Sequence, residues 1–181
     1  MSTMAGSGRF RKMVAGVTLA ALLGAVLVIL FYLYGRASVE PIALGRLLPD
    51  VRLHTWSGGP ASLQTVLSRK ALVLFFTVDC PHCVTEVQHF AALHTTKKDS
   101  LQFLFVSLSS ADDTRRFLMT WRNTIPIVRA EPAEAKGALG IITLPSLFCV
   151  DGGGRVVYRR FGERPFEADE DLVHILIREV L

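Results

Sequence analysis

The sequence predicts an α/β domain with a mixed central sheet and helices on both faces, preceded by one membrane-spanning helix. Two uncharged apolar runs, at 71–78 and 101–109, are typical of strands buried on both faces. Each run is followed by a segment whose apolar residues recur at helical spacing. A hairpin and a further helix come next, and this order of elements predicts the mixed sheet.

An uncharged apolar run at 13–35 predicts the membrane-spanning helix, because about 1.5 Å of rise per residue lets it cross a hydrocarbon core of roughly 30 Å. A cleaved signal peptide is the alternative, but its apolar core would be shorter. Basic residues precede the run, so we expect 1–12 to stay in the cytoplasm. The rest would cross the cytoplasmic (inner) membrane once, with a tether at 36–46 and a folded domain at 47–181 in the periplasm or at the outer face.

The charge of the chain does not indicate a nucleic-acid partner. The sequence has 20 basic and 16 acidic residues, but 1–36 hold four basic residues and no acidic one. This leaves 16 basic and 16 acidic residues in a neutral remainder. Short basic pairs are interpreted as solvated surface rather than a track for phosphates: Lys97-Lys98, Arg115-Arg116 and Arg159-Arg160.

The expected elements of the domain follow in order. Two short strands joined by a Gly-Gly-Pro turn lie in "LPDVRLHTWSGGPASL". After the strand at 71–78, a helix is expected from Pro81 to about Thr95, with proline where a first helical turn tolerates it. After the strand at 101–109, a helix begins near Asp112. The remaining expected elements are a short helix at 134–139, a strand within 143–150, a turn at 151–154, a strand at 155–161 and a helix at 170–180.

Cys80 and Cys83 lie three positions apart where a buried strand ends and a helix begins, at the sheet edge where open α/β folds place their sites. With Pro81 as the first helical residue, Cys80 occupies the N-cap, where free backbone N–H groups and the helix dipole stabilise a thiolate. Cys83, one turn further on, is more shielded but close enough to attack a mixed disulfide on Cys80. We expect Cys80 to be the nucleophile and Cys83 the resolving thiol of a redox-active disulfide.

Two other interpretations of this pair are weaker. A permanent bridge would close so short a loop that it removes little entropy from the unfolded chain. A structural zinc site requires four ligands. Cys149 is not a good candidate for a third one, because it is a lone residue in a predicted apolar strand. His89 and His94 are five positions apart and do not share a helical face well. We therefore expect no metal and no other cofactor.

Three neighbours of the pair are candidates for tuning its chemistry. Protonated His82 would add positive charge beside Cys80 and favour its thiolate, whereas the carboxylate of Asp79 would oppose ionisation. Glu86 lies three residues beyond Cys83 on the same side of the helix, where a partly buried carboxyl could relay a proton to or from Cys83. The alternative for both His82 and Glu86 is an ordinary surface position.

Three stretches together resemble the membrane-anchored thioredoxin-like proteins of the TlpA and ResA kind: "LPDVRLHTWSGGPASL", "ALVLFFTVDCPHCVTE" and "GIITLPSLFCVDGGGRVVYRRFG". The resemblance runs from about Leu47 to the C-terminus and implies a thioredoxin-like fold with an N-terminal strand extension. It implies a cis peptide bond before Pro145, which would lie against the redox pair. It also implies that the backbone of Leu144 pairs with substrate, and that Glu86 matches a glutamate of that family.

The sequence departs from that family in two places. Asp79 stands where the family usually has tryptophan, and Leu74 replaces a buried acidic or amide group of thioredoxin relatives, so proton handling is expected to differ. The Pro-His pair between the cysteines is the one seen in DsbA-type oxidants, but 107–144 is too short for the helical insertion of DsbA. The resemblance therefore leaves the direction of electron flow open.

The expected function is that of a membrane-tethered thiol:disulfide oxidoreductase. Its expected partners are extracytoplasmic protein thiols or disulfides and a membrane or extracytoplasmic redox donor, and the resemblance suggests a role in cytochrome c maturation. A peroxiredoxin-type peroxidase is the enzymatic alternative, because Thr77 stands three residues before Cys80, although Val73 replaces the proline of that motif. A copper-delivery module of the SCO type is the non-catalytic alternative. Such modules place three residues between their cysteines, and this chain has no histidine between His94 and His174.

Overall fold

The computed structural model describes residues 7–35, 40–56, 59–97, 99–122, 124–165, 168 and 171–174. The chain divides into two compact units, Met1–Ser38 and Val39–Leu181, and each is described by itself.

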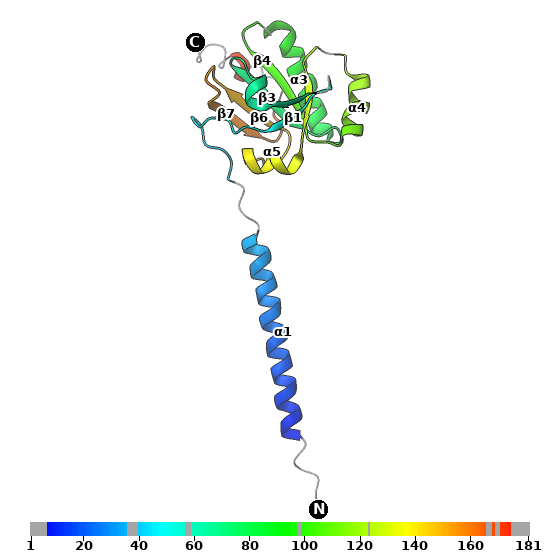
Figure 1. Ribbon diagram of the computed structural model, residues 1–181, viewed down its shortest axis with the longest axis vertical. Coiled ribbons are helices and arrows are strands. Elements are labelled where there is room, and N and C mark those ends of the chain that lie inside the picture. Colours follow the sequence, from blue (N-terminus) through cyan, green and yellow to red (C-terminus); the bar gives the residue numbers. More distant parts are fainter. Residues whose placement is uncertain are drawn as a thin grey trace, which may run out of the picture. The chain divides into compact units, whose positions relative to one another are not determined.

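The first unit contains a long helix, α1, at Ser7–Gly35 (Figure 1). Large apolar side chains along it, including Leu22, Leu27 and Phe31, are exposed. Taken over the residues that the structure describes, no helix is both long enough and apolar enough to cross a membrane. The membrane-spanning helix expected at 13–35 is therefore not confirmed and stays a prediction.

The second unit is built on a sheet that contains seven strands within its described residues, in the order β2-β1-β5-β4-β3-β6-β7. β3, β4 and β5 are parallel, whereas β1 and β2 on one side and β6 and β7 on the other pair antiparallel. The predicted mixed sheet is therefore confirmed. The strands are β1 (Arg52–His54), β2 (Pro60–Ser62), β3 (Ala71–Phe76), β4 (Gln102–Ser107), β5 (Ile127–Ala130), β6 (Ser146–Val150) and β7 (Val156–Phe161).

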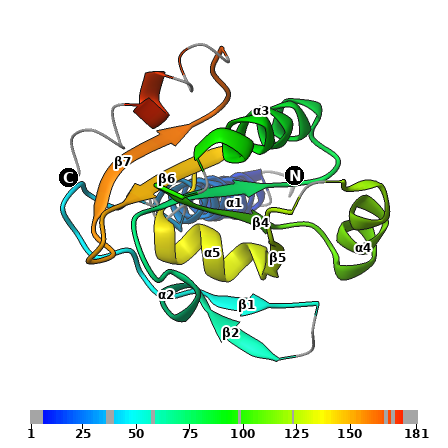
Figure 2. The same cartoon turned by 90° about the horizontal axis from the view of Figure 1, so that it is seen from above.

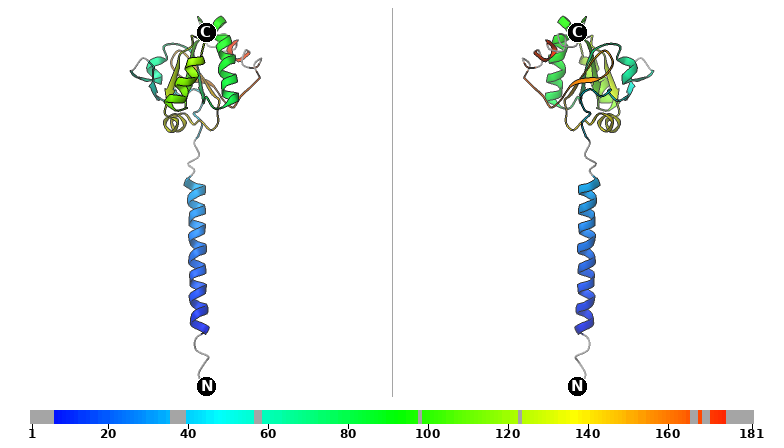
Figure 3. Two further views of the ribbon diagram at one scale, coloured as in Figure 1. Left: turned by 90° about the vertical axis from the view of Figure 1, so that its right-hand side faces the viewer. Right: turned by 90° about the vertical axis from the view of Figure 1, so that its left-hand side faces the viewer.

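The central strand β3 explains why the sheet needs helices on both faces. All of its side chains are buried, and alternate side chains point to opposite faces. Leu74 and Phe76 pack in the core beneath α3 (Pro81–Lys97), and Val73 and Phe75 pack in the core beneath α5 (Pro132–Leu139). Figure 2 shows α3 and α5 on opposite sides of the sheet, and Figure 3 shows these layers from the side.

Helix α4 (Ala111–Thr120) covers part of the same face as α3. Its Phe117 packs against Phe76 of β3, with the ring centroids 5.8 Å apart, and stacks on Trp121. Ser110 caps the helix by accepting a hydrogen bond from the N–H of Asp113. The helix expected near Asp112 is thus confirmed, and it begins at Ala111.

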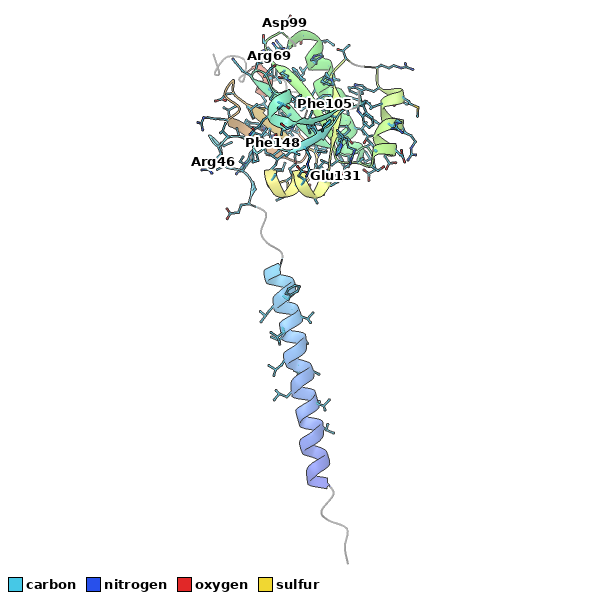
Figure 4. The ribbon with its side chains drawn as sticks, viewed as in Figure 1. Arg46, Arg69, Asp99, Phe105, Glu131 and Phe148 are labelled. Carbon is cyan, nitrogen blue, oxygen red and sulfur yellow. The ribbon has the colours of Figure 1, made fainter. Side chains whose placement is uncertain are left out.

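The aromatic core of the α5 face fixes β6 against β3. Phe148 of β6 meets Phe75 edge-to-face, with the ring centroids 5.8 Å apart, and contacts Phe161 of β7 at 6.0 Å. Figure 4 labels Phe148 and Phe105 among the side chains of the sheet. Because β6 starts at Ser146, this packing also sets the position of the residues just before it.

Two elements were not predicted from the sequence. β5 is short, follows Pro126 and contains Arg129, so no apolar alternation marks it, and its pairing with β4 defines it. α2 (Leu63–Val66) is a single turn capped by Ser62.

The ends of the folded unit also differ from the expected ones. The N–H of Gly45 donates to the carbonyl of Val156 at 2.7 Å, and that of Leu48 donates to Gly154 at 2.9 Å, so the compact unit begins before the expected boundary at 47. Of the helix expected at 170–180, residues 171–174 are helical, and 175–180 lie outside the described residues.

Candidate active site

The strand directions bring three segments of the chain to one edge of the sheet. β3 and β4 are parallel, so the chain leaves both strands at the same edge. β6 is antiparallel to β3, and Ser146 pairs with Phe75, so the residue before β6 arrives at this edge. Cys80, which follows β3, and Pro145, which precedes β6, therefore belong to one edge, as the sequence predicted for Cys80 and the family resemblance implied for Pro145.

Cys80 is the residue before α3 and is partly exposed. The backbone N–H of Cys83 donates a hydrogen bond to the sulfur of Cys80 at 3.3 Å, and the N–H of Val84 donates to the Cys80 carbonyl at 3.1 Å. These are the contacts of a helix N-cap, so the predicted capping position of Cys80 is confirmed. Neither cysteine is in a disulfide in this structure, and the N–H of Cys83 points at the sulfur of Cys80.

Cys83 is fully buried in the first turn of α3. Burial, together with its hydrogen bond to the side chain of Cys80, raises the pKa of Cys83 from 9.0 to about 12, although contacts with Thr77 act in the opposite direction. At neutral pH Cys83 is therefore the neutral thiol. The arrangement pairs a partly exposed, capped sulfur with a buried, protonated one.

The peptide bond between Leu144 and Pro145 is cis, as the family resemblance implied. Pro145 is buried, whereas Leu144 is half-buried and packs against the same core as Cys80. The Pro145 carbonyl accepts a hydrogen bond from the N–H of Gly162 at 2.8 Å, which ties this loop to the end of β7. Ile142, two residues before Leu144, is 64% exposed. The loop therefore offers accessible chain at the sheet edge that also carries Cys80.

Glu86 lies buried one turn beyond Cys83, with 1% of its surface exposed. Its carboxylate accepts a hydrogen bond from the guanidinium of Arg160, which is itself buried. Arg160 also donates to the carbonyl of Gly162. The structure thus excludes the surface alternative for Glu86, and its carboxylate is held in an ion pair that the sequence did not predict.

His82 is exposed on the first turn of α3 and contacts Glu163, which follows β7. Its Nδ1 lies 2.5 Å from Oε2 of Glu163. Asp79, on the chain just before Cys80, is also exposed. The imidazole of His82 and the carboxylates of Glu163 and Asp79 are thus exposed near the start of α3.

A cavity of about 320 Å³ opens beside the segment that leads to Cys80. It is lined by the chain at 77–79, the chain at 108–110 and Asp113. The Ser110 hydroxyl, and after it the nearby Arg116, lower the pKa of Asp113, so this wall carries a stable negative charge.

A family model described as the AhpC/TSA family matches residues 44–159, which is more than half of the chain. The chain belongs to the AhpC/TSA family. In this AhpC/TSA chain, the matched residues include both cysteines, His82, Glu86 and the cis proline.

Relatives and solved structures agree on the fold of this AhpC/TSA domain. The thioredoxin-like protein YneN of Bacillus subtilis is 28% identical over 148 residues, which cover 80% of this chain and 86% of YneN. The thioredoxin domain of a thiol-disulfide oxidoreductase from Bacteroides vulgatus has a TM-score of 0.63 at 19% identity, covering 73% of this chain and 99% of that one. StoA from Bacillus subtilis has a TM-score of 0.57 at 22% identity, covering 69% and 96%. The fold is thus thioredoxin-like.

Sequence reasoning missed Arg160 and Glu163 of this AhpC/TSA domain. Arg159-Arg160 was interpreted as solvated surface, which is wrong for Arg160, because it is 8% exposed and neutralises Glu86. The strand alternation of "RVVYRRF" places Arg160 on the face of Tyr158, which packs in the core beneath α3, and this was the available signal. No pattern marked Glu163. Among the residues that the structure describes, no three His, Cys, Asp or Glu side chains are grouped closely enough to hold a metal ion.

The difference between the two thiols predicts selective alkylation. Near neutral pH, iodoacetamide should modify Cys80 of the folded, reduced protein and leave Cys83 unmodified. Cys83 forms its reactive thiolate only as the pH rises towards its pKa of about 12. Tandem mass spectrometry of the peptide that contains both residues locates the label. In urea, where burial is lost, both cysteines should react. Equal labelling in the folded protein would contradict the assignment of roles.

The buried pair of Glu86 and Arg160 predicts a large loss of stability when one partner is removed. Arg160→Met leaves the Glu86 carboxylate buried without its counter-ion, which costs about 3–5 kcal/mol in the free energy of unfolding. The double variant Glu86→Leu with Arg160→Met should recover most of this loss, because no charge then stays buried. Urea unfolding followed by tryptophan fluorescence measures both variants.

A matched control for that experiment is Arg115→Met. Arg115 lies 3.7 Å from Asp112, and both side chains are exposed. Its replacement should change the stability by less than about 1 kcal/mol. If Arg160→Met lost no more stability than Arg115→Met, the buried ion pair would contribute no more to the free energy of unfolding than an exposed one.

Proposed function

We propose that this protein is a membrane-tethered thiol:disulfide oxidoreductase that exchanges disulfides with extracytoplasmic protein thiols. The observation that carries the proposal is the inequality of the two sulfurs. Cys80 is partly exposed and accepts a hydrogen bond from the start of α3, whereas Cys83 is buried with a pKa of about 12. Such a pair suits a nucleophile and a resolving thiol.

In the reductive direction, the Cys80 thiolate attacks one sulfur of a client disulfide. A bond forms between Cys80 and that sulfur, the client disulfide breaks, and the other client sulfur leaves with the electron pair. Cys83 then loses its proton and attacks the Cys80 sulfur, which releases the second client sulfur. The client gains two electrons and two protons, one proton from Cys83 and one from solvent, and Cys80 and Cys83 become a disulfide. The oxidative direction is the reverse of these steps.

The loop at Leu144 and Pro145 supplies a docking place for the client chain in this proposal. Leu144 packs against the same core as Cys80, and exposed chain at Ile142 and Thr143 precedes it. An extended client segment can pair with the backbone of Leu144 while its sulfur faces Cys80. This agrees with the role that the family resemblance implied for Leu144.

Glu86 is proposed to accept or return the proton of Cys83. It lies one turn from Cys83 on α3 and is buried with it. Its ion pair with Arg160 holds the carboxylate in place on this side of the site. Protons would then move to and from Cys83 through the Glu86 carboxylate, whose position is fixed by Arg160 of β7.

The membrane attachment is part of the proposal and rests on the sequence at 13–35. That run is uncharged, its described large apolar side chains in α1 are exposed, and basic residues precede it. Apolar residues occupy successive positions at 26–31, so apolar side chains surround the helix there. It has no polar face to turn towards water, as a helix on the surface of a soluble protein would. The proposed location is the cytoplasmic (inner) membrane, with 1–12 in the cytoplasm and the AhpC/TSA domain in the periplasm or at the outer face.

The structure gives one observation against the peroxidase alternative. A threonine of a peroxidatic site acts together with the nucleophilic cysteine, but Thr77 makes its hydrogen bonds to the resolving Cys83. Val73, which replaces the motif proline, is buried in β3. Thiol:disulfide exchange is therefore favoured over peroxide reduction.

Removal of the resolving thiol predicts a trapped intermediate. Cys83→Ala should accumulate a mixed disulfide between Cys80 and a client protein, because nothing then attacks the Cys80 sulfur. Non-reducing gel electrophoresis of membranes from cells that carry the variant shows adducts that disappear with dithiothreitol.

Cys80→Ala is the control and should give no adduct. Absence of adducts in Cys83→Ala, together with slow dithiol exchange by the wild type, would overturn the proposed function. Rapid peroxide consumption by the reduced wild type would support the peroxidase instead.

The proposed anchor predicts that the full chain resists extraction from membranes by alkaline carbonate and is released by detergent. A variant that starts at Val39, the first residue of the second unit, should be recovered in the soluble fraction. A full chain found entirely in the soluble fraction would contradict the anchor.

A further inference from the structure

The contact between His82 and Glu163 takes no part in the exchange cycle described above. It joins the first turn of α3 to the segment after β7, with 2.5 Å between Nδ1 and Oε2. The side chains are 69% and 50% exposed. An exposed pair of this kind contributes little to stability, so its effect on the ring of His82 is of more interest.

Glu163 decides which nitrogen of His82 is available. A carboxylate only accepts hydrogen bonds, so Nδ1 of His82 carries a proton whether the ring is neutral or charged. Nε2 is then the nitrogen that gains and loses a proton. A carboxylate that fixes the tautomer and orientation of an imidazole in this way is a common support for acid–base chemistry.

Two of the other proton carriers near the pair, Cys83 and Glu86, are buried and already hydrogen-bonded. Cys83 is buried and hydrogen-bonded to Thr77, and Glu86 is buried in its ion pair with Arg160. Asp79 and Cys80 precede the ring on its own segment, and Asp79 is exposed. Among the described groups, Glu163 is the charged side chain that contacts the ring. The ring of His82 is exposed in the first turn of α3, two residues after Cys80, so a client chain bound at Cys80 can reach it.

Building on the proposed function, we infer that His82 is the proton donor and acceptor for the client sulfur, and that Glu163 is its positioning residue. In the reductive direction, the client sulfur that leaves takes the electron pair of the broken disulfide and receives the proton of Nε2. This yields a client thiol and a neutral ring whose Nδ1–H stays on Glu163, and solvent returns a proton to Nε2. In the oxidative direction, a client thiol gives its proton to Nε2 as its sulfur attacks Cys80.

Proton donation by His82 should speed disulfide exchange more when the leaving thiol is less acidic. A sulfur that leaves as a stable anion needs no proton, whereas an ordinary cysteine thiolate, of pKa about 8.5, gains from one. The experiment compares two disulfides with the reduced full chain in detergent. One is glutathione disulfide, and the other is a nitrobenzoate aromatic disulfide whose leaving thiol is strongly acidic. Both probes are anionic, so a change in surface charge affects both rates alike.

The quantity measured is the ratio of the glutathione rate to the aromatic rate. His82→Ala should lower this ratio about tenfold, at the low end of what general acid–base catalysis contributes. Glu163→Ala should lower it by a similar factor. The double variant should show no further fall, because Glu163 acts through His82. Glu163→Gln should retain most of the ratio, since its amide oxygen still accepts a hydrogen bond from Nδ1.

Glu131→Ala is a matched control. It removes a carboxylate that lies 3.9 Å from the ring of His54, at the end of β5, two strands from β3 in the sheet. The ratio should not change in this variant. Figure 4 labels Glu131.

Three results would overturn the inference. Equal slowing of both probes by Glu163→Ala would show a structural effect or an effect on the Cys80 thiolate. A double variant whose loss is the product of the single losses would show that Glu163 acts without His82. If the ratio in Glu163→Gln fell as low as in Glu163→Ala, Glu163 would not act by accepting a hydrogen bond from Nδ1 of His82. If the wild type exchanges with neither disulfide, the proposed function itself fails, and this outcome is distinct from the other three.

Discussion

The hydrogen bond from the N–H of Cys83 to the sulfur of Cys80 is the contact on which the site depends. It exists because α3 begins at Pro81, directly after the tight segment that follows β3. The start of α3 is fixed in turn by burial, since Val87 and Phe90 pack against the same face of β3 as Leu74 and Phe76. If the helix began a residue later, the sulfur of Cys80 would lose this hydrogen-bond donor.

The site divides into a dry side and a wet side around the two sulfurs. On the dry side, Cys83 and Glu86 are buried, and Arg160 neutralises the carboxylate that would otherwise be costly there. On the wet side, His82 is exposed and meets the carboxylate of Glu163. Disulfide exchange needs both environments, because the resolving sulfur must stay protonated while the other sulfur reacts with a client disulfide.

Much of this arrangement could be predicted from the sequence because it is local. The strand at 71–78, the helix from Pro81 and the capping of Cys80 follow from apolar runs, a proline and a spacing of three. Pairing across the sheet is not local, which is why β5 was missed and why its order between β4 and β1 came only from the structure. The family resemblance, and not periodicity, led to the cis bond before Pro145.

The charged partners were the hardest part of the site to predict. A buried Glu86 implies some cation nearby, but the chain offers many, and choosing among them requires the register of β7 against β6. Arg160 pairs with Leu147 in that register, on the face of the sheet that α3 covers. Glu163 lies beyond the strand, where neither alternation nor register gives a direction. Sequence patterns place side chains within an element, and these contacts lie between elements.

The end of β7 contacts three separate parts of the site within four residues. Arg160 binds Glu86, the N–H of Gly162 binds the Pro145 carbonyl, and Glu163 binds His82. This stretch is the end of β7, the last strand in the order of the sheet, and the two residues after it, and none of it belongs to the Cys-Pro-His-Cys turn. Divergence among related chains could therefore adjust redox behaviour by altering this stretch alone, with the Cys-Pro-His-Cys turn left intact. Two homologues with the same motif need not share the same chemistry.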